Sequence, residues 1–397
     1  MDSDLFFTGV VERLASNGCG VIRCHDSNFF VYGAAAGEKV VCKKTAGFNA
    51  ELIEILRPSS DRTPPRCNYY GRCGGCSLRH INYEAQVREK TTILHDAFRY
   101  SGGISELPPV SIHKSPPDGY RDRVQFHKTV YSRPSITRKT LLTNNNTPPF
   151  GFMERYSNTI IPLDDCPVLN STLRAVLSHG SITPPIEKDR FAVYGREGTL
   201  ISEGGVSRKE FRFIAGGAAE TVMVDAGVFF QSNGVMLEQL IERLLEIAAE
   251  STALPAGDFY SGVGVFAVFL RRLFSCIDVL EENRAAVELA RANIGVENGV
   301  FYALSDSAWV KRHGAKAKSY GFLCVDPGRQ GLSPAMRNWL CTKRPATLAY
   351  ISCEPSALAR DARSLCTAGF LLTSLDFFDF YPQTSRIETL AVFKRNV

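Results

Sequence analysis

The stretch Asp258-Phe-Tyr-Ser-Gly-Val-Gly-Val-Phe266 is a glycine-rich turn that follows an acidic residue. A single Gly-x-Gly loop is a weak signal, because many strand-to-helix turns use one. Seventeen positions after Gly264 (281 − 264), however, an apolar run ends in Glu281, which is near the spacing typical of Rossmann-like folds. In Rossmann-like folds an acid at that spacing faces a ribose diol, although a lone Glu281 would more often cap a helix or face solvent. Together the turn and the acid predict a nucleoside-cofactor site in an α/β sheet.

The rest of the C-terminal half, from about residue 222, repeats this α/β pattern. Residues 235–247 predict an amphipathic helix, and two later apolar runs end in Asp326 and Cys353. The carboxyl ends of parallel strands are where such sheets bind ligands, so Cys353 is a candidate nucleophile, although cysteine is usually a core residue. Glu388 begins a final apolar strand. Taken alone, it is more typical of a surface residue than of a base.

Four cysteines form a second motif. Cys67, Cys73 and Cys76 lie in a glycine-punctuated Cys-x5-Cys-x2-Cys run, and Cys166 can supply a fourth thiolate. Such thiolates can hold a four-iron cluster or a tetrahedral zinc ion, and four ordinary buried cysteines are the remaining possibility. Twelve cysteines in 397 residues favour a reducing compartment with a metal-held subset over a disulfide scaffold.

Two segments precede the α/β part, and we place their boundaries after residues 58 and 221. Residues 1–58 contain five short apolar runs between turns, typical of an OB-type barrel that either binds oligonucleotides or acts as a structural cap. Residues 59–221 carry the cysteines, a helical pattern over 83–98 and an alternating strand over 119–128. The helix is expected beside the cysteines or against the third domain. The strand's aromatic and Arg residues suit RNA bases and phosphates, or equally a solvated strand edge. Residues 143–149 are expected to form a polar loop.

The composition is that of an ordinary globular protein, with 44% hydrophobic and 22% charged residues. A net charge of +5 permits an anionic partner without requiring one. The chain lacks the run of about 18 apolar residues that a membrane span needs, and its start lacks a signal-peptide pattern. We therefore expect a cytoplasmic protein with no membrane partner, and a monomer.

These motifs occur together in one family. The chain resembles RNA 5-methyluridine (uracil-C5) methyltransferases, in the 23S rRNA branch with a TRAM domain and a 4Fe-4S cluster. The resemblance covers nearly the whole chain. Besides the cysteines, it is carried by Phe229-Phe-Gln-Ser-Asn233, Asp258–Gly264, Glu281, Asp326-Pro-Gly-Arg329, Ser352-Cys-Glu-Pro355 and Arg386-Ile-Glu388. It implies a Rossmann-like S-adenosylmethionine-dependent methyltransferase domain (222–397), an OB-like TRAM barrel (1–58) and a central iron–sulfur, RNA-binding domain (59–221).

The resemblance also implies the site residues and their roles. Cys353 adds to C6 of a flipped uridine in RNA, C5 takes the methyl group from S-adenosylmethionine, and Glu388 removes the C5 proton. The cofactor-binding positions are Gln231, Tyr260, Gly262, Gly264, Glu281, Asp306 and Asp326. The cluster ligands are Cys67, Cys73, Cys76 and Cys166, and the cluster is expected to be structural or to position RNA.

Three residues depart from the family pattern. Gly328 replaces a proline and is expected to loosen the loop that shapes the uridine pocket. Glu354 replaces an asparagine and would raise the pKa of Cys353 unless its carboxylate points away. Val265 stands where a polar residue is common. The alternatives are a tRNA uridine-C5 methyltransferase, a redox or radical enzyme that lacks the usual Cys-x3-Cys-x2-Cys signature, and a non-catalytic RNA-binding protein.

Overall fold

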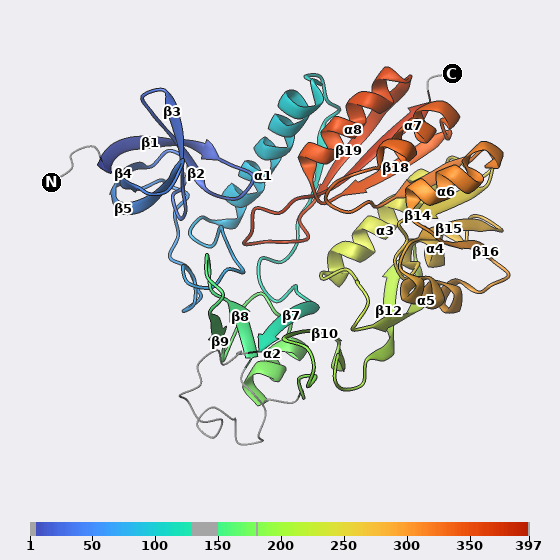
Figure 1. Cartoon of the computed structure of the whole chain (residues 1–397), viewed down its shortest axis with the longest axis horizontal. Helices are drawn as coiled ribbons and strands as arrows, with labels where there is room; N and C mark the ends of the chain where they lie inside the picture. Colours follow the sequence, from blue (N-terminus) through green and yellow to red (C-terminus); the bar gives the residue numbers. More distant parts are fainter. Residues whose placement is uncertain (1–4, 129–149, 180–181, 396–397) are drawn as a thin grey trace.

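The computed structural model describes residues 5–128, 150–179 and 182–395 (Figure 1). The polar loop expected over 143–149 lies outside them. None of the helices in these ranges is long and apolar enough to cross a membrane.

The N-terminal strands close into a five-stranded barrel in the order β1-β2-β3-β5-β4, which confirms the predicted OB-like architecture. Alternate side chains point inward, and the barrel core includes Val11, Ile22 and Val40. In Figure 1 the barrel lies beside α1. Its strands are β1 (Phe6–Leu14), β2 (Gly20–Cys24), β3 (Ser27–Val31), β4 (Lys39–Lys44) and β5 (Asn49–Arg57).

The middle of the chain forms a second sheet, in the order β11-β10-β7-β8-β9. The strand predicted over 119–128 is shorter than expected, since β7 begins only at Arg123. It lies at the centre of the sheet with Val124 and Phe126 buried, so the alternative of a solvated edge is wrong. The elements are β7 (Arg123–Lys128), β8 (Phe150–Met153), β9 (Ile160–Pro162), α2 (Ser171–His179), β10 (Arg190–Arg196) and β11 (Thr199–Ser202).

An eight-stranded sheet forms the largest layer, in the order β16-β15-β14-β17-β18-β20-β19-β6. Strands β14 to β18 are parallel, whereas β20 is antiparallel to both β18 and β19. The strands are β6 (Val110–His113), β14 (Ala256–Phe259), β15 (Ile277–Glu281), β16 (Gly299–Ala303), β17 (Phe322–Val325), β18 (Thr347–Ser352), β19 (Phe370–Phe378) and β20 (Glu388–Arg395).

Helices cover both faces of this sheet, and for that reason its central strands are apolar almost throughout. On one face Cys324 packs among residues of α3, α4 and α5, and on the other Leu323 packs among residues of α1, α6, α7 and α8. The helix predicted over 235–247 is confirmed as α3. The helices are α1 (Tyr83–Ala97), the π-helical η2 (Phe98–Gly102), α3 (Gly234–Ala249), α4 (Val265–Leu270), α5 (Arg284–Ile294), α6 (Asp306–His313), the short 3-10 helix η4 (Gly314–Lys316), α7 (Pro334–Lys343) and α8 (Pro355–Thr367).

Elements from before residue 222 also join this layer. Strand β6 pairs in parallel with β19, and α1 and η2 pack against α8. The hairpin of β12 (Arg208–Ala215) and β13 (Ala218–Asp225) packs on α3, α4 and α5. The expected division after residue 221 therefore falls inside β13.

The order of the strands indicates where a ligand binds. From β14 the chain continues to β15 and β16 on one side, and then to β17 and β18 on the other. The crevice at the carboxyl ends of β14 and β17 is thus the topological switch point of the sheet.

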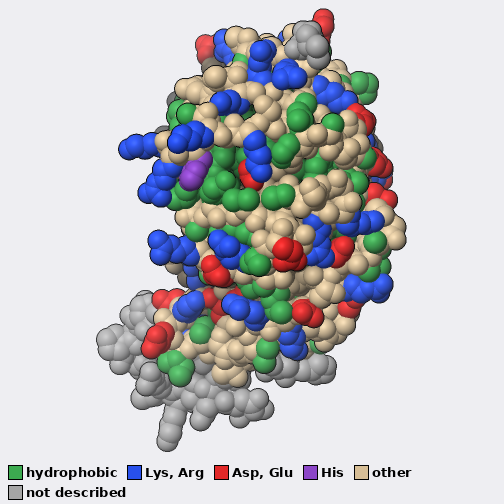
Figure 2. All heavy atoms as spheres, turned by 90° about the vertical axis from the view of Figure 1, so that its right-hand side faces the viewer, with side chains coloured by type: hydrophobic (Ala, Val, Ile, Leu, Met, Phe, Trp, Pro, Cys, Tyr) green, Lys and Arg blue, Asp and Glu red, His purple; other side chains and the backbone are tan. Residues whose placement is uncertain are grey.

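Figure 2 shows the face opposite the barrel, where Lys and Arg side chains are spread among acidic and apolar ones.

Candidate active site

A cavity of about 1670 Å³ lies at this switch point. Every predicted catalytic and cofactor-binding residue lines it except Gly264. Gly264 instead caps α4 in a left-handed conformation, and a Cβ there would come within 2.8 Å of Ile294 Cδ1 on α5. Its role is therefore close helix packing, which is one of the uses of glycine in such turns.

Glu281 organises the glycine-rich turn. Its carboxylate accepts hydrogen bonds from the Gly262 backbone N–H (3.0 Å) and the Asn283 backbone N–H (2.7 Å). Two backbone donors fix the carboxylate at the end of β15, beside the left-handed residue Tyr260. The acid predicted from its spacing thus lies against the turn.

Asp306 and Tyr260 form a second acidic corner of the cavity. The Tyr260 hydroxyl (2.6 Å) and the Ser333 backbone N–H (3.2 Å) both donate to Asp306 Oδ2. Burial raises the pKa of Asp306, but these hydrogen bonds outweigh that effect and hold the pKa below its usual value. Asp306 is therefore ionised at neutral pH.

Gln231 places a hydrogen-bond acceptor that has no donor at the wall of the cavity. Its side chain is 8% exposed, and its Oε1 is buried with no hydrogen-bond partner among the described residues. Because an unpaired buried carbonyl is costly, the atom fits a ligand that brings a hydrogen-bond donor.

Cys353 and Glu388 face each other across adjacent antiparallel strands. The register pairs Ser352 with Thr389, so the residue after β18 and the first residue of β20 are opposite one another. Glu388 is 3% exposed, which corrects the expectation from the lone residue that it lies on the surface. Its position at the start of an inserted, centrally placed strand is the reason for its burial.

These groups and Asp326 are electrostatically linked. Burial and the charge of Glu281 raise the pKa of Asp326 to about 7, and burial and the charge of Asp326 raise that of Glu388. Burial raises the pKa of Cys353 most, and the charges of Glu388 and Asp326 raise it further, to about 12. The positive charge of Arg329 partly opposes this rise. The carboxylates responsible are Glu388 and Asp326 rather than the adjacent Glu354.

Other residues in the cavity were not assigned from the sequence. Ser16 and Asn17, in the turn between β1 and β2 of the barrel, line it, as do Arg329 and Arg386. The Asn17-Gly18 pair indicated only a turn in the sequence. The turn and Arg386 are far apart in sequence, so the sequence does not indicate that they are neighbours. In the structure they are close, because a Cβ on Gly18 would lie 3.2 Å from the Cβ of Ser385, the residue before Arg386.

The two remaining departures from the family pattern lie in different surroundings. Val265 is buried at the start of α4 and packs in the core. Gly328 lines the catalytic cavity, where it is exposed, and a Cβ there would meet no protein atom within 4 Å.

We expect Gly328→Ala to leave activity within about twofold and to raise the free energy of unfolding by about 0.4–1 kcal/mol. The backbone of Gly328 is outside the left-handed region, so the substitution restricts the unfolded chain without straining the folded one. Thermal unfolding and turnover of the purified variant check this. A lower unfolding midpoint would contradict it.

The four predicted metal ligands also meet in space. A second cavity, of about 560 Å³, is lined by Cys67, Cys73, Cys76 and Cys166. Arg386 lines both this cavity and the first one. The Gly75 backbone N–H donates to Cys73 Sγ (3.4 Å). In the described part of the chain, however, no three His, Cys, Asp or Glu side chains are grouped tightly enough to hold a metal ion.

Comparison with known proteins relates this arrangement to a family. The family described as tRNA (Uracil-5-)-methyltransferase matches residues 219–396. An uncharacterized RNA methyltransferase of Treponema denticola is 30% identical over 376 residues, 87% of each chain. A 23S rRNA (uracil(1939)-C(5))-methyltransferase of Pseudomonas putida is 27% identical over 97% of this chain and 92% of its own.

Among solved structures, a tRNA (uracil-54, C5)-methyltransferase of Pyrococcus abyssi in complex with S-adenosyl-L-homocysteine has the same fold. It matches 98% of this chain and 100% of its own with a TM-score of 0.67 and 21% identity. The α/β sheet is therefore a methyltransferase fold preceded by a five-stranded barrel. At the level of the family, the resemblance seen in the sequence is confirmed: this chain belongs to the RNA (uracil-5-)-methyltransferase family.

Proposed function

We propose that this protein methylates C5 of a uridine in 23S ribosomal RNA, with Cys353 as nucleophile and Glu388 as base. The observation that carries the proposal is the meeting of these two side chains, from adjacent strands, in the cavity at the switch point. A thiol and a carboxylate so placed can act on neighbouring atoms of one flat ring. Neither a redox reaction nor simple RNA binding needs that pairing.

The proposed reaction uses both groups in sequence. The Cys353 thiolate forms a bond to C6, and the electron pair of the C5=C6 double bond moves toward C5 and O4. C5 would take up the methyl group of S-adenosylmethionine, whose methyl–sulfur bond would break to leave S-adenosylhomocysteine. Glu388 then accepts the C5 proton, the C–H electron pair restores the C5=C6 bond, and Cys353 leaves as a thiolate.

The charges of the cavity suit a cationic cosubstrate. Glu281, Asp306 and Asp326 surround the Gly262 turn, and Gln231 Oε1 offers a free acceptor. We propose that Glu281 binds the ribose hydroxyls, Asp306 lies at the adenine end, and Gln231 and Asp326 lie toward the reacting end. Burial is the main cause of the raised pKa of Cys353, and the charges of Glu388 and Asp326 add to it, so a positive ligand beside Asp326 would lower that pKa.

Ribosomal RNA is preferred over transfer RNA because of the relatives. The Pseudomonas putida relative, which matches 97% of this chain, is named for uracil 1939 of 23S rRNA. The Pyrococcus abyssi protein, named for a tRNA, shares only the fold at 21% identity. Unmodified 23S rRNA and tRNA transcripts, each incubated with methyl-labelled S-adenosylmethionine, distinguish these substrates. We expect 5-methyluridine in 23S rRNA, and label in tRNA alone would overturn this substrate.

We further propose that Cys67, Cys73, Cys76 and Cys166 hold a 4Fe-4S cluster in a central domain between a TRAM barrel and the methyltransferase domain. All four thiols line one cavity of about 560 Å³, which supports a shared metal centre, and the resemblance seen in the sequence favours a cluster over a single zinc ion. The Gly75 N–H bond to Cys73 Sγ is of the kind that tunes cluster cysteines. We also propose that the protein is a monomer in the cytoplasm, where ribosomal RNA is found.

We expect Cys166→Ser to remove iron. Anaerobically purified protein should contain about four iron and four sulfide ions per chain, and the variant less than half as much. Iron and sulfide analysis with visible absorption checks this, and Cys366→Ser, on α8, is the matched control. Stoichiometric zinc in the unaltered protein would contradict the cluster.

A further inference from the structure

We propose that Gln86, Lys90 and Ser77 are positioning residues that hold the segment Asp379–Arg386 so that Glu388 reaches C5 of the uridine. This segment, here called the 379–386 arm, links β19 to β20 and leads directly into Glu388. The inference rests on the proposed function, since it concerns the step in which Glu388 removes the proton.

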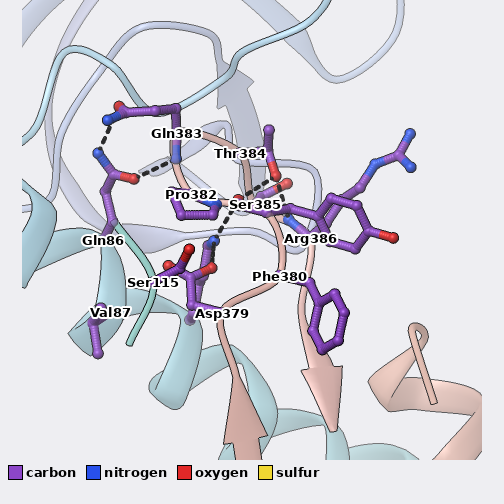
Figure 3. A network of polar contacts seen from close by, with 12 residues as sticks. Gln86, Val87, Ser115, Asp379, Phe380, Pro382, Gln383, Thr384, Ser385 and Arg386 are labelled. Atoms are coloured by element: carbon purple, nitrogen blue, oxygen red, sulfur yellow. Dashed lines mark hydrogen bonds and ion pairs between the residues drawn. The ribbon is translucent and has the colours of Figure 1, made fainter. Parts of the chain in front are cut away.

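Gln86, on α1, forms hydrogen bonds with the arm at Gln383. Its Nε2 donates to Gln383 Oε1 (3.0 Å), and its Oε1 accepts from the Gln383 backbone N–H (2.8 Å), as Figure 3 shows. The same Nε2 also contacts the carbonyl oxygens of Leu78 (3.2 Å) and Ile81 (3.0 Å). Gln383 is a non-glycine residue with φ of 67°, a left-handed conformation that persists only where its surroundings enforce it.

Lys90 holds the arm one helical turn further along α1. Its Nζ donates to Asp379 Oδ1 (2.7 Å) and to the Tyr381 carbonyl oxygen (2.9 Å), and both charged side chains are fully buried. A buried ion pair is a weak source of stability because both charges lose their hydration. Its value here is geometric, since it fixes the residue at which the arm leaves β19.

Ser77 connects the arm to the cysteine run. The backbone N–H groups of Ser77 and Leu78 both donate to the Gln383 carbonyl oxygen (2.9 Å each), and Ser77 Oγ accepts from the Ser385 N–H (3.0 Å). Ser77 directly follows Cys76, which lines the cysteine cavity. The arm is thus held by α1 on one side and by the end of the cysteine run on the other.

The C-terminal end of the arm reaches the catalytic cavity at Ser385 and Arg386. The Arg386 N–H donates to Thr384 Oγ1 (3.2 Å), and the Arg386 side chain extends away from the network in Figure 3. Arg386 lines both the catalytic and the cysteine cavity, and Glu388 follows two residues later. None of the three positioning residues lines the catalytic cavity. We infer that they act on catalysis through the arm.

The test compares Gln86→Met, which keeps the length of the side chain and removes its polar atoms, with Thr347→Val. Thr347 is a buried residue that shares a hydrogen bond with Ser251 at the opposite end of β18. We expect Gln86→Met to accelerate backbone hydrogen exchange over 380–388 by about tenfold and to lower turnover by about ten- to hundredfold. Methylated protein–RNA adduct should accumulate, and the Kd for S-adenosylmethionine should stay within about twofold.

A second variant guards against misfolding. Gln383→Gly tolerates the left-handed backbone and loses only the side-chain contacts, so the same adduct should accumulate in a folded protein. Loss of turnover without adduct, or effects equal to those of Thr347→Val, would overturn the inference. The exchange measurement needs no RNA. If unaltered protein made no 5-methyluridine, the proposed function would fail, whereas unchanged exchange over 380–388 would refute the arm itself.

Discussion

Replacing Cys353 with alanine is expected to lower the rate of 5-methyluridine formation by a factor of about 10⁴ or more. The loss follows because C5 of uracil becomes nucleophilic only after a bond forms at C6, and among the described residues no other side chain in the cavity offers a thiol. Nucleoside mass spectrometry of treated RNA measures the product. The Kd for S-adenosylmethionine should be unchanged, because the residues proposed to bind it remain.

The matched control is Cys366→Ala, which removes a half-buried cysteine from α8, outside the cavity. It should keep activity within about threefold. The unaltered protein should also form a stable adduct with RNA that contains 5-fluorouridine, because fluorine at C5 cannot leave as a proton. An adduct with Cys353→Ala would contradict the assignment of the nucleophile.

Glu388→Gln is expected to lower turnover by about 10²–10⁴-fold while methyl transfer still occurs. The amide cannot accept the C5 proton, so Cys353 cannot be eliminated and the methylated RNA stays bound to the protein. Denaturing gel electrophoresis with methyl-labelled S-adenosylmethionine should show label in a protein–RNA band. Burial, and then the charge of Asp326, raise the pKa of Glu388.

Two further variants locate the base. Glu250→Gln removes an exposed carboxylate that pairs with Lys394 (2.6 Å), near the far end of β20, and should turn over normally. Glu354→Gln removes the carboxylate next to Cys353. If Glu354→Gln accumulated the adduct and Glu388→Gln did not, the base would be Glu354.

The sequence predicted those site residues whose positions follow from the local succession of strands and turns. Glu281, Asp326 and Cys353 each end an apolar run, and the rule that parallel strands present their carboxyl ends together brings them into one cavity. Glu388 did not follow from this rule by itself. Its strand is antiparallel and lies between β18 and β19, and local periodicity does not encode that insertion.

Contacts between residues far apart in sequence account for the other differences. Nothing in residues 110–113 indicates pairing with β19, and nothing around Gln86 indicates a partner at Gln383. Ser16 and Asn17 likewise reach the cavity only because the barrel packs beside the arm. Gly264, predicted as a cofactor-binding residue, packs against α5, and Glu388, typical of a surface residue when taken alone, is buried. Both positions depend on neighbours that the linear pattern does not contain.

The most direct test of the central claim is mass spectrometry of nucleosides from unmodified 23S rRNA incubated with the intact protein and S-adenosylmethionine carrying a deuterated methyl group. The account predicts 5-methyluridine that bears the deuterated methyl, and none with Cys353→Ala. Methyl label on any other atom or base, or equal product from Cys353→Ala, would contradict it.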